Sequence, residues 1–239
     1  MLICEDLFLL LTTDEGGTEP WVSYRDYGLA AGLLADLTLA QCLTVEPGRW
    51  GGTKVSLAAE ADPASTAALR EQSPPLAFGI EALADRKPTA VSTVVVAGWF
   101  NPRQAIVDGL TERGIVGVVG KRMLGLVPEK HPTLDARPEA DTRARLLAAL
   151  QGARPAAADA LILSVLKSLG AAPHVLKAEL EAAGMRRGQA HKRIDELTEA
   201  LPVEASAGGK AVASAIAGIQ AAIGAAVAAS VAGGAAASN

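Results

Sequence analysis

The chain has 239 residues, a formal net charge of −4 at pH 7 and a mean hydropathy of +0.26. Half of the residues are hydrophobic, which excludes a disordered chain, but only 3% are aromatic, so Ala, Leu and Val must build the core. A chain of this length buries roughly 70% of its unfolded surface, in one large domain or two small ones. The acidic balance argues against a general nucleic-acid binder, because phosphate contacts need a basic face. Two cysteines and three histidines argue against a disulfide framework or a metal-built fold, and we expect no cofactor.

The first third of the chain predicts helices interrupted by one hairpin. Residues 2–11 are an apolar run typical of a helix; Glu5 and Asp6 interrupt it and no basic residue precedes it, which excludes a secretory signal and predicts a cytoplasmic protein. Residues 26–40 form the strongest predicted helix, because their leucines recur on one side at helical spacing. The other predicted elements are a turn at 14–17, a hairpin with arms 42–45 and 54–57 around the Pro/Gly-rich segment 47–52, and short helices at 64–70 and 76–83 separated by Pro74 and Pro75.

The next part of the chain is again punctuated by turn residues. Asn101 and Pro102 begin a predicted helix that ends at Gly114, where a C-terminal capping glycine belongs. A second hairpin is predicted with arms 115–119 and 123–127 around Gly120-Lys121-Arg122, and further helices at 139–150, 156–169, 175–183 and 187–201. With no interdomain linker or repeat, we expect a mainly α fold. It is a single globular helical domain with a central helical bundle, surrounding amphipathic helices and two short β-hairpins.

The C-terminal stretch carries no charged residue after Lys210 and is long enough to span a bilayer. Ala, Gly and Ser dominate it, and its larger residues fall on one narrow face of a helix: Val212, Ile216, Ile219, Ile223 and Val227. A lipid-spanning helix would be apolar all round, so we favour an amphipathic helix docked on the domain over a membrane span. We expect one domain over residues 1–232 and a flexible tail at 233–239.

Enzyme motifs are weak in this sequence. Residues 51–54 and 120–121 resemble fragments of phosphate loops but lack the glycine spacing and the following Ser or Thr, so they are read as hairpin turns. His131, His174 and His191 lie far apart with no ligand at helical spacing, and we expect them in turns or on the surface. No Gly-x-Ser-x-Gly and no Cys/His motif occurs. We therefore expect no catalytic residues, no metal site and no enzymatic activity.

Three short segments combine aromatic and basic residues and are candidates for binding: residues 20–25, 99–103 and 120–124. In the third segment and just after it, cations stand beside apolar residues: Lys121, Arg122, Met123, Leu124 and Leu126. Such a hairpin suits a membrane interface, where cations meet phosphates and the apolar tip enters the acyl boundary. Residues 99–130 hold five basic and three acidic residues, a local charge of +2 that leaves −6 for the remainder. An ordinary solvated hairpin is the alternative interpretation.

The order of these motifs resembles the Golgi phosphoprotein 3 family in its compact bacterial form, over nearly the whole chain. The resemblance is carried by the acidic-then-leucine opening at 5–11, Trp21 followed by residues 28–37, Trp99-Phe100-Asn101-Pro102, residues 110–115, Lys130-His131-Pro132 with Leu134, and residues 193–197 before the Ala-rich end. The ordered set carries the resemblance, rather than any single segment. It implies a mostly helical domain with small hairpins and no catalytic activity.

The resemblance also implies a binding site. Eukaryotic relatives are peripheral membrane proteins that bind phosphatidylinositol 4-phosphate through a Trp, an Arg on the following helix and two Arg three residues apart, with a hydrophobic hairpin that inserts into the bilayer and contributes to self-association. Here Trp21 matches the Trp and Arg103 the second of the paired arginines, whereas Ala30 and Phe100 stand at the other two arginine positions. Arg25, or Lys121 with Arg122, would then supply the replacement charge.

We therefore expect a cytoplasmic, peripherally membrane-associated protein that binds anionic, phosphoinositide-type lipid headgroups. The expected headgroup residues are Trp21, Arg25, Phe100 and Arg103, with the 120–126 hairpin in contact with the membrane. The expected partner is anionic membrane lipid; a protein partner and self-association are compatible with the same face, and nucleic acid is not expected. The alternative is a soluble protein-interaction module, an adaptor or scaffold, that uses this face without lipid, because membranes and protein grooves both reward mixed apolar and cationic contacts.

Overall fold

A computed structural model of the chain describes residues 1–20, 22, 24–48, 52–58, 63–120, 129–200, 218 and 221. The helices are α1 (Ile3–Leu10), α2 (Arg25–Leu39), α3 (Pro63–Gln72), α4 (Pro74–Ala84), α5 (Val91–Val96), the 3₁₀ turn η1 (Gly98–Phe100), α6 (Arg103–Glu112), α7 (Arg137–Leu150), α8 (Ala157–Ser168), α9 (Ala172–Val175), α10 (Lys177–Ala182) and α11 (Arg187–Glu199). The strands are β1 (Leu43–Pro47), β2 (Thr53–Leu57) and β3 (Thr89–Ala90). The fold is mainly α, as the sequence predicted.

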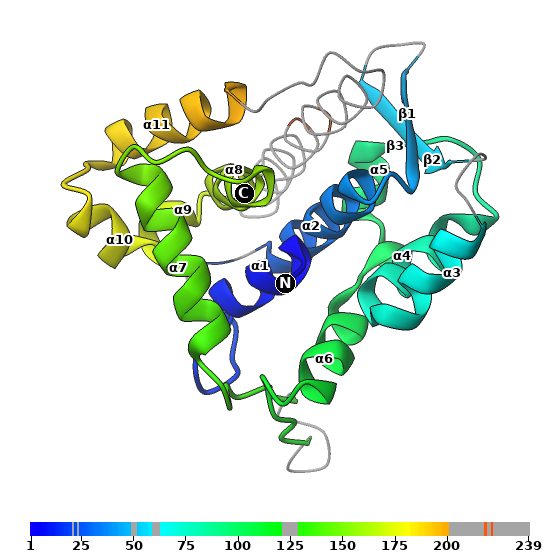
Figure 1. Cartoon of the computed structure of the whole chain (residues 1–239), viewed down its shortest axis with the longest axis horizontal. Coiled ribbons are helices and arrows are strands. Elements are labelled where there is room, and N and C mark those ends of the chain that lie inside the picture. Colours follow the sequence, from blue (N-terminus) through cyan, green and yellow to red (C-terminus); the bar gives the residue numbers. More distant parts are fainter. Residues whose placement is uncertain are drawn as a thin grey trace, which may run out of the picture.

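Helices α1 and α2 form the centre of the molecule, with α7 to α11 on one side and α3, α4 and α6 on the other (Figure 1). Every residue of α1 is buried, because α2, α6, α7 and α8 all pack against it. The α2 leucines that the sequence placed on one helix face, Leu29, Leu33, Leu34 and Leu37, are all fully buried. The apolar periodicity of α2 therefore marks the core correctly.

Asp36 ties these two central helices together. Its carboxylate accepts hydrogen bonds from the backbone N–H groups of Ile3 at 2.8 Å and Cys4 at 3.0 Å, so a side chain of α2 caps the N-terminus of α1. Gly32, one turn earlier, lets the backbones approach, since a Cβ there would lie 2.9 Å from Cys4 Cα. Burial raises the pKa of Asp36 to about 7, which the two N–H bonds only partly oppose.

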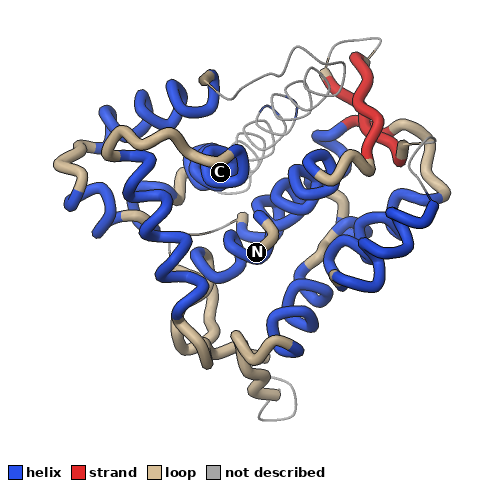
Figure 2. Tube along the Cα trace, viewed as in Figure 1, coloured by secondary structure: helices blue, strands red, loops and turns tan. Residues whose placement is uncertain are grey.

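A small antiparallel sheet closes one edge of the molecule, in the strand order β1-β2-β3 (Figure 2). Leu43 pairs with Leu57 and Val45 with Val55, which confirms the first predicted hairpin. Strand β3 adds Thr89 opposite Val55. The sequence analysis assigned no element to the segment that contains β3 and α5.

A buried ionic network fastens α7 to its neighbours. Arg145 bonds Asp159 of α8 at 2.9 Å and Asp6 of α1 at 3.3 Å, and the Thr142 hydroxyl donates to Asp6 at 2.7 Å. Burial raises the pKa of Asp6, although Thr142 and Arg145 favour its charged form. The acidic residues at the start of the chain therefore serve packing inside the domain.

Most predicted helices are confirmed within one to three residues at their ends, and Gly114 adopts the left-handed φ of +68° expected of a C-terminal capping glycine. Pro74 and Pro75 do not separate two helices by themselves: they are the first two residues of α4, where the missing N–H costs nothing. The predicted helix at 175–183 is wrong in its extent. The chain breaks at Leu176 into α9 and α10, and the Val175 carbonyl accepts a bond from Arg143 at 2.8 Å.

The first arm of the second predicted hairpin pairs with residues 130–133, whereas its predicted second arm, 123–127, lies outside the described residues. Val116 pairs with Thr133 and Val119 with Lys130, whereas a turn at 120–122 would have paired Val119 with Met123. A bond from the Thr133 N–H to the Asp14 carbonyl at 3.0 Å holds the second arm against the loop after α1, so long-range contacts select this register.

At the C-terminus, Gly218 and Ala221 are helical, and Gly218 lies against Thr53 of β2. The rest of the predicted terminal helix and the tail at 233–239 lie outside the described residues, so the docked amphipathic helix stays a prediction. Within the described part of the chain, no helix is long and apolar enough to cross a membrane.

Candidate functional site

The candidate site is built around the first residues of two helices, Arg25 of α2 and Arg103 of α6. Both arginines were expected at the site from the sequence. Of the other expected residues, Phe100 is described. Trp21 and the hairpin residues lie outside the described residues: Lys121, Arg122, Met123, Leu124 and Leu126. The described site therefore rests on Arg25, Arg103 and their surroundings.

Arg25 is a buried cation, with only 7% of its surface exposed. Its Nη1 donates to the Thr12 hydroxyl at 3.4 Å, and its guanidinium carbon lies 5.7 Å from the centre of the Phe8 ring. Its Nε has no hydrogen-bond partner, and among the described residues it forms no ion pair. Burial, and next the charge of Arg103, lower the pKa of Arg25 to about 10, so it stays charged at neutral pH. A buried, unpaired guanidinium is costly, and such groups gather at binding sites.

Arg103 is half-buried and stands at the N-terminus of α6. Its backbone N–H donates to the Asn101 side-chain oxygen at 3.1 Å, and the Asn101 amide donates to the Asp26 carboxylate at 3.0 Å. This chain of bonds joins the N-termini of α2 and α6, which carry the two arginines. Two positive helix ends and two guanidiniums therefore converge on one region, an arrangement that favours an anion.

His131 is a third member of the cluster, and the sequence analysis placed it wrongly. It was expected in a turn or on the surface, but it is 4% exposed, in the second arm of the hairpin. Its ring lies 6.2 Å from that of Phe8, the ring that also contacts Arg25. Burial comes first in lowering its pKa, and Arg103 and Arg25 lower it further, while Glu129 opposes them. In the sequence, Lys130-His131-Pro132 contributes only to the family resemblance. No pattern in the neighbouring residues indicates that the His131 side chain is buried.

Phe100 does not contribute a binding surface. Its ring is fully buried between Phe78, at 6.0 Å between ring centres, and Trp99, at 5.7 Å. Ala30 is buried in α2 as well. Both positions point into the core, so the apolar residues there fit the packing, and Phe100 no longer belongs to the expected headgroup contacts.

Apolar side chains stand exposed on the paired arms of the hairpin. Val118 is 51% exposed and Leu134 is 67% exposed, and Leu134 packs beside Gly117. Val118 lies directly opposite His131 in the register of the arms. The surface next to the cationic cluster therefore mixes exposed aliphatic groups with Lys130, which is also exposed.

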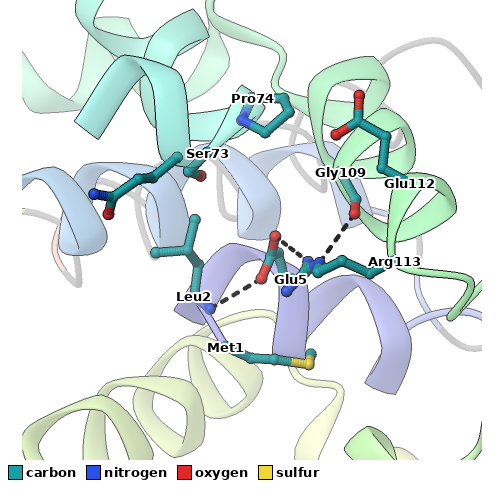
Figure 3. Close-up of a pocket in the computed structure, with 9 residues that line it drawn as sticks. Met1, Leu2, Glu5, Ser73, Pro74, Gly109, Glu112 and Arg113 are labelled. Carbon is teal, nitrogen blue, oxygen red and sulfur yellow. Dashed lines mark hydrogen bonds and ion pairs between the residues drawn. The ribbon is translucent and has the colours of Figure 1, made fainter. Parts of the chain in front are cut away.

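A concave region lies at the other end of α6 from Arg103 (Figure 3). This cavity of about 340 Å³ is lined by Met1, Leu2, Glu5, Gln72, Ser73, Pro74, Gly109, Glu112 and Arg113. Glu5 is already engaged there, with Arg113 at 2.5 Å and with the Leu2 N–H at 3.1 Å. Arg103 and Glu112 are the first and last residues of α6, about 13.5 Å apart along the helix axis. The cavity is thus separate from the cationic cluster, and its one cationic side chain, Arg113, is already paired with Glu5.

No group of residues in the described part of the chain has the composition of a metal site. The cluster of Arg25, Arg103 and His131 offers proton donors and positive charge, which are the chemistry of anion recognition.

Comparison with known proteins gives a family. The profile of the Golgi phosphoprotein 3 family matches residues 3–219, which span the α1–α2 centre, both hairpins and the cationic cluster. The comparison with curated proteins found no match. The chain belongs to the Golgi phosphoprotein 3 family.

Proposed function

We propose that this protein is a non-enzymatic peripheral membrane protein that binds anionic phospholipid headgroups at the Arg25–Arg103 cluster. The observation that carries the proposal is the buried guanidinium of Arg25 beside Arg103, which forms no ion pair with any residue that the structure describes. Arg103 is the accessible cation and Arg25 stands behind it, so a phosphate that reaches Arg103 also relieves the repulsion between the two arginines. Family membership supports a headgroup of the phosphatidylinositol 4-phosphate type.

The membrane-facing surface follows from the same region. Exposed Val118 and Leu134 lie next to the cluster, on or beside the paired arms 116–119 and 130–133. Lys121 and Arg122, which follow the first arm in the sequence, are proposed to add charge to this surface. Aliphatic groups that enter the acyl boundary add to the weak attraction of single cations, which is about 1 kcal/mol for each basic residue near an anionic surface. Headgroup recognition and hairpin contact would act together in a cytoplasmic protein recruited to a membrane.

The second candidate function is a protein-interaction module. It is favoured by the same exposed Val118 and Leu134, because an aliphatic patch beside cations also suits a partner chain. The two functions differ in their response to salt and to lipid. Headgroup binding falls as salt rises and grows with the anionic lipid content, whereas binding to a partner chain needs no lipid.

Vesicle co-sedimentation tests the proposal directly. The full chain is mixed with phosphatidylcholine vesicles, with vesicles that also contain phosphatidylglycerol, and with vesicles that contain a small fraction of phosphatidylinositol 4-phosphate, each at low and high salt. We expect pelleting with anionic vesicles, and most strongly with the phosphoinositide. Arg103→Ala should weaken it about tenfold or more, which is the usual loss for a charge-assisted hydrogen bond.

The matched control is Arg154→Ala. Arg154 is exposed and lies in the segment between α7 and α8, away from the cluster, so it removes the same charge without touching the site. If Arg103→Ala and Arg154→Ala weakened vesicle binding equally, the effect would come from the change in net charge and not from the site. Failure of the wild-type chain to pellet with any anionic vesicle would remove the lipid-binding proposal and leave the protein-interaction module.

A further inference from the structure

His131 has an unusual environment for a histidine inside a helical domain. It is 4% exposed, yet its Nδ1 has no hydrogen-bond partner among the residues that the structure describes, and its Nε2 lies 3.6 Å from Glu129 Oε1, beyond hydrogen-bond reach. A buried polar atom without a partner costs free energy unless it serves a ligand or a water molecule. The orphaned Nδ1 therefore needs an explanation beyond packing.

The groups that surround His131 come from several elements. Phe8 of α1 supplies an aromatic ring, Glu129 on the same arm supplies the facing carboxylate, and Arg25 of α2 and Arg103 of α6 supply positive charge. The loop after α1 supplies the Gly16 carbonyl, which accepts the His131 backbone N–H at 3.3 Å. The imidazole and the Arg25 guanidinium both lie against the Phe8 ring, so they belong to one cluster.

We propose that His131 is a third ligand of the anion held by Arg25 and Arg103, and that it binds this anion as an imidazolium ion. The inference rests on the proposed function and adds to it a third residue that contacts the anion and a proton that is taken up on binding. The anion is a phosphate-type oxyanion, whether it belongs to a lipid headgroup or is free in solution. Val118 lies opposite His131 in the hairpin arms, which places this third ligand next to the exposed apolar surface.

The charges around His131 explain why protonation and binding are coupled. Without an anion, burial and the two arginines lower the pKa of His131, and Glu129 and a backbone hydrogen bond with Gly117 only partly oppose them, so the neutral ring is favoured. A bound oxyanion neutralises the arginines and supplies an acceptor for an imidazolium N–H. The pKa of His131 then rises, and one proton is taken up from solvent by the ring when the anion binds.

This coupling has a definite sign. Because the complex holds the proton more tightly than the free protein does, affinity for the anion rises as the pH falls through the interval between the two pKa values. A rise of about one pKa unit on binding gives a gain of up to about tenfold in affinity across the interval. Arg25, with a pKa of about 10, stays charged throughout this range, and Asp36, with a pKa of about 7, lies eleven residues further along α2, so we assign the slope of anion binding to His131.

Nuclear magnetic resonance of the wild-type chain tests the proposal without a mutation. The pKa of His131 is measured with and without inorganic sulfate, an oxyanion that does not itself titrate near neutral pH. His191 of α11 is the internal reference, since burial also lowers its pKa but it lies on an element far from the cluster (Figure 1). We expect sulfate to raise the pKa of His131 by about one unit and to leave that of His191 unchanged.

Vesicle binding provides the second arm and identifies the source of the anion. The wild-type chain, His131→Gln and the control His191→Gln are tested against phosphatidylglycerol vesicles, whose diester charge is constant, from about pH 5.5 to about pH 7.5. Binding of the wild type and of His191→Gln should strengthen as the pH falls, and binding of folded His131→Gln should not. Sulfate binding that raises the His131 pKa, with no vesicle binding, would assign the site to a free anion and overturn the lipid source.

The remaining outcomes separate the two proposals. Sulfate or vesicle binding with an unchanged His131 pKa, or with a pH slope that His131→Gln shares, would overturn the role of His131 and leave the Arg25–Arg103 site intact. Absence of both sulfate and vesicle binding at every pH would overturn the proposed function, and the role of His131 with it.

Discussion

The Asn101 side-chain amide donates a hydrogen bond to the Asp26 carboxylate at 3.0 Å, across 75 residues of sequence. The other end of the same amide accepts the Arg103 backbone N–H. One side chain thus connects the first turn of α2 with the first turn of α6, and the arginines that open these helices are held close enough for each other's charge to matter. The cationic cluster is therefore a product of helix packing rather than of any one segment.

Replacing Arg25 should separate binding from stability. Arg25→Met keeps a long apolar stem and removes a buried, unpaired charge, so we expect the free energy of unfolding to rise by about 1–2 kcal/mol while anion binding falls. Urea denaturation and vesicle co-sedimentation measure the two effects. Arg25→Lys keeps the charge but loses the planar fork, and should bind weakly without the gain in stability. A destabilised Arg25→Met variant would show that the guanidinium serves the fold.

Gly16 should be intolerant of a side chain. Its φ is +81°, and a Cβ there would lie 2.3 Å from the His131 backbone nitrogen and 2.4 Å from its carbonyl carbon. Gly16→Ala should cost about 2 kcal/mol or more and displace the arm that carries His131. Gly188→Ala is the matched control: this exposed glycine in α11 has open space around it, and the change should stabilise by about 0.5–1 kcal/mol. Thermal unfolding compares the two variants, and similar melting temperatures would contradict the argument.

The cap that Asp36 makes on α1 should depend on pH. Burial raises its folded pKa from 3.8 to about 7, so between these values the folded state holds a proton that the unfolded chain has released. Stability contributed by this group therefore falls as the pH rises through that interval. We expect the wild type to lose stability relative to Asp36→Asn as the pH rises from 3.8 to about 7, in urea titrations. Parallel pH dependences of the two proteins would show that Asp36 ionises normally.

Two arginine–carboxylate contacts should contribute very differently to the free energy of unfolding. Arg145→Met leaves the buried Asp6 and Asp159 without their cation and should cost about 2 kcal/mol, less than a fully buried pair because Arg145 is itself half exposed. Since the pKa of Asp6 is already raised, the deficit should shrink as the pH falls. The measurement is urea denaturation at neutral and at mildly acidic pH.

The comparison variant is Arg137→Met. Arg137 lies 2.7 Å from Asp135 and holds the pKa of that carboxyl at about 2, but the arginine side chain is 88% exposed. Solvent screens such a pair, so we expect little change in stability despite the shorter distance. If Arg137→Met lost more stability than Arg145→Met, burial would not determine how much these ion pairs contribute to stability.

Local patterns predicted the helices well because they depend on neighbours three and four residues apart. The α2 leucines, the start of α6 at Asn101-Pro102 and the glycine after it all encode their roles within one or two helical turns. The pairing of the second hairpin was predicted in the wrong register, since the Gly120-Lys121-Arg122 turn signal is weaker than the bonds that tie 130–133 to the loop after α1.

The candidate site was predicted only in part. Arg25 and Arg103 were chosen as cations beside aromatic residues, and both stand in the cluster. Phe100 was chosen by its place in a motif, but its ring fills the core, and His131 was set aside because a lone histidine carries no local sign of burial. The exposure of a side chain and the charges around it depend on elements that are distant in the chain, so no local sequence pattern predicts them.

The sequence by itself determined that this protein is a mainly α member of the Golgi phosphoprotein 3 family, because apolar periodicity and ordered motifs are properties of the chain alone. Tertiary structure alone decided that Arg25 is buried with no ion pair among the described residues, that His131 turns inward beside Phe8, and that the charge of Arg103 lowers the pKa of both. The physical reason is range: helix formation is settled within a few residues, whereas desolvation and charge proximity arise only when α1, α2, α6 and the hairpin arms pack together.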